Sequence, residues 1–189
     1  MQWLIGGPTK GLSSWARCVG EDLIEGARLD MIMAYFSPPR RLLQRIGNIA
    51  RKGETRLIMA AKSDNGATIG ASRSLYHDLL KRGAKIFEFE PCKLHMKLIV
   101  LDDAVYLGSA NFDMRSLYVN LELMLRIEDR GLADRMRQFV DTHIPASTEI
   151  TPALHRQRSG LWTRIKWNLS WFLVAVVDYT VSRKLNLGL

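Results

Sequence analysis

Cysteine is scarce in this sequence, which contains only Cys18 and Cys92 among its 189 residues. The two lie far apart, and no Cys-x-x-Cys or Cys/His spacing accompanies them. These absences exclude a disulfide framework and a cysteine-based metal site. We therefore expect a reducing compartment and no metal held by cysteine.

Two kinds of membrane-directed segment are also missing. The first residues, MQWLIGGP, contain no basic stretch and no apolar run of useful length, so no secretion signal is expected. The most apolar stretch, residues 169–177, is bracketed by Arg164, Lys166 and Asp178. It falls well short of the ~20 residues that a membrane-spanning helix requires, so a transmembrane span is not expected.

Acidic residues are rare in the C-terminal fifth of the chain. The net charge is +8, and residues 151–189 contain six arginines and lysines against Asp178 alone. Clustered positive charge attracts polyanions, so we expect an anionic phospholipid surface as partner, with a nucleic acid as the alternative. A solvated basic tail is the simplest other interpretation. The chain as a whole, 47% hydrophobic and 24% charged, has the composition of one folded domain.

Apolar residues alternate between strand-like and helix-like segments over the first 145 residues, an order typical of an α/β domain. Strands are expected near residues 3–5, 31–36, 55–60 and 84–89, and helices near 13–27, 42–49, 72–81 and 130–142. A hairpin is expected over residues 94–107, with Asp102 and Asp103 in its turn.

The last third of the chain divides into three parts. Leu121, Leu123, Leu125 and Ile127 alternate with other residues, which indicates a half-buried strand. Residues 146–160 contain many polar residues and few core-forming ones, and we expect them to form a linker. Residues 161–189 predict a separate basic, tryptophan-rich helix of amphipathic or apolar character.

A histidine and a lysine two residues apart suit phosphate chemistry. Strand residues i and i+2 point to the same side, which places the imidazole of His95 beside the ammonium group of Lys97. A neutral imidazole can attack phosphorus, and an ammonium group neutralises the charge that builds on the phosphate oxygens. Asp102, seven residues after His95, is expected at the hairpin turn in a supporting role.

The return strand leads to Gly108, Ser109 and Asn111, which extend the candidate site. Gly108 would allow close approach of the backbone to a substrate, while Ser109 and Asn111 can donate hydrogen bonds to phosphate oxygens. Asn120 and Glu122 are expected on the polar side of the next strand. A carboxylate held near an imidazole fixes its tautomer and raises its basicity.

These residues fit the pattern H-x-K-x4-D-x5-G-S-x-N over residues 95–111. The pattern resembles the HKD motif of the phospholipase D superfamily, which implies a mixed β-sheet flanked by helices. The catalytic half-domain would cover residues 1–145. Further similarity to the C-terminal catalytic half of bacterial cardiolipin synthases lies in the segments AYFSP (34–38), KSD (62–64), SRSLY (72–76) and NFDMRS (111–116).

The resemblance implies a metal-free, two-step transfer through a phosphohistidine, by a phosphatidyltransferase or phospholipase acting on anionic phospholipid. His95 would be nucleophile or acid, and Lys97 and Asn111 would bind the phosphate. Glu122 would orient the histidine. The residues expected to bind or support the phosphate beside them are Gly108, Ser109, Asp102, Asn120 and Arg115.

Such a site needs two HKD motifs, and this chain contains one. Neither His77 nor His143 is followed by a lysine two residues later, and His155 lies in the expected linker. The resemblance therefore implies a homodimer with facing motifs, or pairing with a second HKD half-domain. A homodimeric nuclease acting on nucleic acid and a non-catalytic partner-binding subunit are the alternatives.

The C-terminal helix combines Trp162, Trp167 and Trp171 with flanking arginine and lysine. Aromatic and cationic side chains favour the headgroup region of a bilayer, so this helix is expected to lie in the membrane interface. Docking on the protein body is the alternative. The expected location is the cytoplasmic face of a membrane, as a peripheral or monotopic protein.

Overall fold

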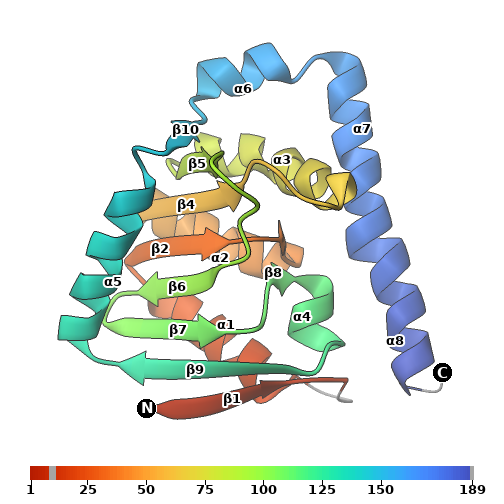
Figure 1. Ribbon diagram of the computed structural model, residues 1–189. Helices are drawn as coiled ribbons and strands as arrows, with labels where there is room; N and C mark the ends of the chain where they lie inside the picture. Colours follow the sequence, from red (N-terminus) through yellow and green to blue (C-terminus); the bar gives the residue numbers. More distant parts are fainter. Residues whose placement is uncertain (9–11, 188–189) are drawn as a thin grey trace.

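An eight-stranded mixed β-sheet forms the centre of the structure, a computed structural model that describes residues 1–8 and 12–187 (Figure 1). The strand order is β1-β9-β7-β6-β2-β4-β5-β10. Strands β2, β4 and β5 run parallel, and the other neighbouring pairs are antiparallel. The strands are β1 (Gln2–Gly6), β2 (Arg28–Met33), β4 (Glu54–Ala60), β5 (Lys85–Phe89), β6 (Lys97–Leu101), β7 (Ala104–Gly108), β9 (Glu122–Glu128) and β10 (Ser147–Glu149).

Helices pack on both faces of this sheet, so the predicted α/β architecture is confirmed. A small parallel pair, β3 (Phe36–Ser37) with β8 (Phe112–Asp113), lies beside the main sheet. The helices are α1 (Ser14–Glu25), α2 (Arg40–Lys52), α3 (Gly66–Lys81), α4 (Met114–Tyr118), α5 (Arg130–His143), α6 (Pro152–Arg158), α7 (Leu161–Phe172), the π-helical η1 (Leu173–Asp178) and α8 (Tyr179–Leu187).

Alternating strand residues divide the core into two layers. In β2, Met31 and Met33 pack in the layer that contains Trp15 of α1, whereas Ile32 packs in the opposite layer with Val140 of α5. All five side chains are fully buried. Close packing on both faces fixes the positions of the central strands, and with them the side chains at the strand ends.

Strand β9 presents a different side to the core from the one that its leucines predict. Met124 is fully buried, whereas Leu121 and Leu123 are 83% and 51% exposed. At this end of the sheet the helices α1 and α4 contact β1 on the face that carries Leu4 and Met124. The predicted strand is present, but its buried side chain in the main core is the methionine between the leucines.

Residues 146–160 do not form the expected linker. Ser147–Glu149 is β10, which pairs with β5 and completes the sheet, and Ile150 is buried beside it. Pro152–Arg158 is α6, begun by the Thr151 side chain, which accepts a hydrogen bond from the amide of Leu154 at 3.1 Å. Most side chains of β10 and α6 are exposed, which explains the polar composition, while Ile150 and His155 are buried and hold the segment on the body.

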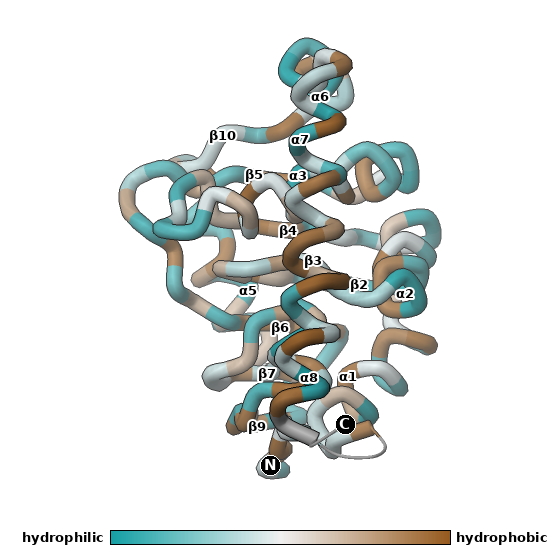
Figure 2. The backbone as a smooth tube through the Cα atoms, turned by 90° about the vertical axis from the view of Figure 1, so that its right-hand side faces the viewer, coloured by the Kyte–Doolittle hydropathy of each residue, from teal (hydrophilic) through white to brown (hydrophobic). Residues whose placement is uncertain are grey.

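The C-terminal helical segment, residues 161–187, both docks on the body and exposes an apolar stripe. It packs closely on α3, where a Cβ added to Gly70 would lie 2.6 Å from the Oγ atom of Ser170. The predicted helix is present, and residues 188–189 lie outside the described residues. Figure 2 shows apolar segments recurring along its outer side. The exposed apolar side chains at helical spacing are Trp162, Ile165, Leu169, Phe172 and Val176.

No helix among residues 1–8 and 12–187 is long and apolar enough to cross a membrane.

Candidate active site

Most of the motif residues lie at one end of the sheet, because neighbouring strands run in opposite directions there. His95 lies just before β6, Gly108 ends β7, and Glu122 begins β9. The pairing of β6 with β7 and of β7 with β9 is antiparallel, so these three points share one edge. Figure 1 shows this edge beside α4 and facing the C-terminal helix.

His95 and Lys97 occupy different environments at this edge. His95 is exposed and precedes the strand, whereas Lys97 is the first residue of β6 and is buried. The Nζ atom of Lys97 donates a hydrogen bond to the backbone carbonyl oxygen of His95 at 2.7 Å. Within the described residues no hydrogen bond reaches the His95 ring, so the imidazole is accessible from outside.

The charge on Lys97 is set by burial and by two carboxylates. Burial lowers the pKa of Lys97 from its ordinary value of 10.5, while the negative charges of Glu122 and Asp113 act in the opposite direction. Burial also raises the pKa of Asp113, and a hydrogen bond from the backbone amide of Ser116, at 2.8 Å, opposes that rise. The site thus holds an ammonium group and carboxylates in a partly dry setting, where their interactions are stronger than in water.

Glu122 is joined to a different set of side chains from the one expected. It accepts hydrogen bonds from the Oγ atoms of Ser109 and Ser116, and from Nδ2 of Asn120 at 3.4 Å. Ser109 Oγ also accepts a hydrogen bond from the amide of Leu123 at 3.1 Å. The structure therefore does not join Glu122 to His95; instead Glu122 fixes the ends of the strands around Ser109 and Asn120.

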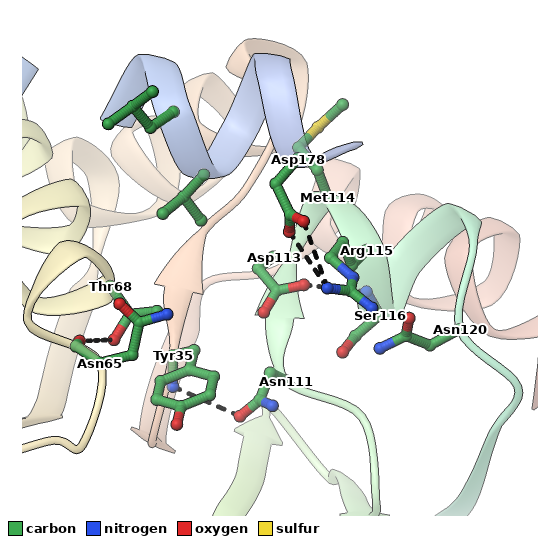
Figure 3. A pocket seen from close by; sticks show the side chains of 12 residues that line it. Tyr35, Asn65, Thr68, Asn111, Asp113, Met114, Arg115, Ser116, Asn120 and Asp178 are labelled. Carbon is green, nitrogen blue, oxygen red and sulfur yellow. Dashed lines mark hydrogen bonds and ion pairs between the residues drawn. The ribbon is translucent and has the colours of Figure 1, made fainter. Parts of the chain in front are cut away.

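Asn111 and Asn120 line a cavity of about 460 Å³ between this edge and the C-terminal helix. The side-chain oxygen of Asn111 accepts a hydrogen bond from the amide of Tyr35 at 3.3 Å, which orients the side chain as Figure 3 shows. Opposite them, η1 contributes Leu173 and Val174 to the wall. The cavity therefore combines amide groups on one side with an apolar wall on the other.

Arg115 and Asp178 link the two walls of this cavity. A terminal guanidinium nitrogen of Arg115 lies 3.2 Å and 3.4 Å from the two carboxylate oxygens of Asp178 (Figure 3). Each side chain is 45% exposed. Of the expected phosphate-binding residues, Arg115 is thus engaged by a carboxylate from the C-terminal helix.

Two of the expected supporting residues have architectural roles. Asp102 lies in the hairpin turn, as predicted, at φ 49°, and its carboxylate accepts hydrogen bonds from the amides of Ala27 and Arg28. It is at the opposite end of β6 from Lys97 and does not join the cluster. A Cβ added to Gly108 would lie 2.2 Å from the carbonyl oxygen of Leu123, so this glycine allows strands β7 and β9 to approach, in place of the expected substrate contact.

Sequence reasoning missed Asp113, Ser116 and Asp178. The first two fall in the NFDMRS segment, which carried a signal through its resemblance but no separate chemical role. Asp178 gave none, because its proximity to Arg115 arises from the return of the C-terminal helix across the body. Among the described residues, no group of three or more His, Cys, Asp and Glu side chains could hold a metal ion.

The family described as "Cardiolipin synthase, PLD-like domain" matches residues 23–144, which include the whole candidate motif. The chain belongs to the phospholipase D-like (PLD-like) domain family. Curated relatives of this PLD-like domain include cardiolipin synthase A of Escherichia coli strain K12, 34% identical over 164 residues, which cover 80% of this chain and 34% of that protein. Cardiolipin synthase A of Yersinia pseudotuberculosis is 35% identical over 153 residues, covering 79% and 31%. The chain thus spans about a third of the length of these relatives.

Solved structures share the fold of the PLD-like domain. Nuc from Salmonella typhimurium, a phospholipase D family member, superposes with a TM-score of 0.67 at 15% identity, covering 79% of this chain and 98% of that one. The phosphatidylserine synthase of Haemophilus influenzae superposes with a TM-score of 0.69 at 13% identity, covering 96% and 47%. The second likeness extends beyond the α/β body into the C-terminal helical segment.

Proposed function

We propose that this PLD-like domain is one catalytic half of an enzyme that transfers or hydrolyses the phosphatidyl group of anionic phospholipids. The observation that supports the proposal is that His95, Lys97 and Glu122 lie at the ends of neighbouring antiparallel strands, with Asn111 in the cavity beside them. Similarity over most of the chain to cardiolipin synthases supports the lipid substrate.

The reaction proposed for this site has two displacements at phosphorus. A ring nitrogen of His95 attacks the phosphorus atom, the bond to the leaving alcohol breaks, and a phosphohistidine forms. Lys97 and Asn111 stabilise the negative charge on the non-bridging oxygens. A second imidazole protonates the leaving oxygen, then accepts the proton of the incoming alcohol or water as the phosphohistidine is resolved.

The second imidazole is proposed to come from another HKD motif. The exposed ring of His95 is open to a partner, since the described residues leave it without a hydrogen bond. Two copies with facing motifs would supply it, as would another half-domain of a longer protein. Either arrangement fits a chain that spans about a third of its curated relatives.

Membrane attachment is proposed for the outer side of the C-terminal helix. Trp162 is 77% exposed and Leu169 is 55% exposed, although both are large and apolar. Arg164 and Lys166 lie on the same helix. The apolar side chains would enter the membrane interface, and the neighbouring cations would bind anionic headgroups. Together these contacts would hold the candidate site near its lipid substrate.

A nuclease remains the second candidate function, favoured by the net charge of +8. Incubation of the chain over a range of concentrations with anionic phospholipid vesicles, and separately with single-stranded DNA, distinguishes the two. Mass analysis should find phosphatidyl-transfer or hydrolysis products from the vesicles and intact DNA. Cleaved DNA with unchanged lipid would establish the nuclease instead. Unchanged lipid and DNA at every concentration would rule out an active homodimer.

A further inference from the structure

The cavity beside the candidate site has one wall that the proposed chemistry leaves unexplained. Its volume of about 460 Å³ falls in the range of roughly 300–1,000 Å³ typical of small-molecule sites. Asn111 and Asn120 connect it to the expected position of the reacting phosphate. The opposite wall comes from η1, whose Leu173 and Val174 would contact the apolar part of a ligand.

The Arg115–Asp178 ion pair spans this cavity at the point where the helix meets the body. Asp178 is the only acidic residue after Glu149 in a strongly basic segment, and it is turned toward the body. Both of its carboxylate oxygens face one guanidinium nitrogen of Arg115, at 3.2 Å and 3.4 Å. Arginine binds phosphate oxygens through the same kind of charge-assisted contact.

We propose that this cavity binds the phosphate-bearing headgroup of a second anionic phospholipid, the acceptor, through Arg115, and that Asp178 is an internal competitor which this phosphate displaces. The inference rests on the proposed function, because it places the acceptor next to the site where the phosphohistidine forms. It adds the acceptor's binding residue and a contact in which Asp178 occupies Arg115 until lipid arrives.

The exposure of the ion pair makes displacement feasible. Each partner is 45% exposed, and pairs of this kind are weak because water screens them. A phosphate offers Arg115 a full charge and several oxygen acceptors. The outer side of the same helix carries the proposed membrane-contacting stripe, so lipid reaching Arg115 would pass along the apolar wall formed by Leu173 and Val174.

The test is calorimetric titration of the chain with dihexanoyl phosphatidylglycerol below its micelle concentration. Asp178→Asn should tighten binding by about two- to fivefold, the amount expected from removing a weak exposed competitor. Arg115→Gln should weaken it by about tenfold or more, because a charge-assisted contact is lost. The double variant should match Arg115→Gln alone, because Asp178 acts only through Arg115.

Asp78→Asn is the matched control, since Asp78 of α3 forms a half-exposed ion pair with Arg82, the residue that follows α3, away from the cavity. Its affinity should stay within twofold of the wild type. Glycerol 3-phosphate should bind more weakly than the lipid, because it lacks the chains that contact the apolar wall. Equal binding of the two ligands, no binding of either, or an Asp178→Asn variant that binds no more tightly would each overturn the inference.

Failure here is distinguishable from failure of the proposed function. The titration measures binding and does not require turnover or a second HKD motif. If the lipid binds, and Arg115→Gln and Asp178→Asn change its affinity as expected, but no lipid is turned over, only the proposed reaction is contradicted. If lipid is turned over, but Arg115→Gln and Asp178→Asn leave its affinity unchanged, only the inference about the acceptor is contradicted.

Discussion

Replacing His95 with alanine should lower the rate of phosphatidyl transfer or hydrolysis by about 10⁴-fold or more. The proposed reaction forms its covalent bond to this imidazole, and removal of a nucleophile leaves only binding and electrostatic contributions to the rate. Because His95 is exposed and its ring forms no hydrogen bond within the described residues, the substitution should leave the thermal unfolding temperature nearly unchanged. Product formation from anionic vesicles and thermal unfolding measure the two effects.

His143→Ala is the control for this prediction. His143 lies at the end of α5, where its Nδ1 atom is 2.9 Å from the carbonyl oxygen of Phe139. Any loss of activity in this variant should be small and should follow its loss of stability. If the His95→Ala variant retains a tenth of the wild-type rate, His95 is not the nucleophile.

Replacing Lys97 with methionine should lower the rate by about 10²- to 10³-fold, the usual cost of losing one group that stabilises transition-state charge. Methionine keeps the unbranched shape at this buried position, so the change removes charge with little change of volume. Activity also requires the protonated lysine. Since burial lowers its pKa from 10.5, the wild-type rate should fall with rising pH before that value is reached.

The charge of Glu122 affects the pH at which the rate falls. Glu122 raises the pKa of Lys97 against the effect of burial, so Glu122→Gln should move the alkaline fall in rate to lower pH. The measurement is the rate against pH for the wild type and the variant. Two results would argue against a required Lys97 ammonium group. One is an alkaline fall in rate that moves to higher pH in Glu122→Gln. The other is an alkaline fall that is identical in Lys97→Met and the wild type.

Periodic patterns were sufficient to predict the main strands and helices of the α/β body and the hairpin that follows His95. The hairpin of β6 and β7 follows from two apolar runs joined by Asp102 and Asp103, and the structure places Asp102 in that turn. Antiparallel pairing then brings His95 and Ser109 to one edge. Local information suffices here because turn chemistry and strand alternation act over a few residues.

The errors arose where long-range packing decides. Leu121 and Leu123 suggested the buried side of a strand. Which face of β9 is covered, however, depends on helices far away in the sequence. Ser147–Glu149 looked like linker, yet it gains stability as a strand through pairing with β5. The contact of Asp178 with Arg115 depends on the path of the whole C-terminal helix, which no local pattern encodes.

The central claim is that the imidazole of His95 bonds covalently to phosphorus during turnover. The most direct test stops the reaction of the chain with anionic phospholipid vesicles by rapid denaturation at alkaline pH. Alkaline conditions preserve a phosphohistidine. Mass spectrometry of peptides spanning His95 should then reveal the added mass of a phosphatidyl group on this residue. Sustained turnover with no such adduct on His95, or with the adduct on another residue, would contradict the account.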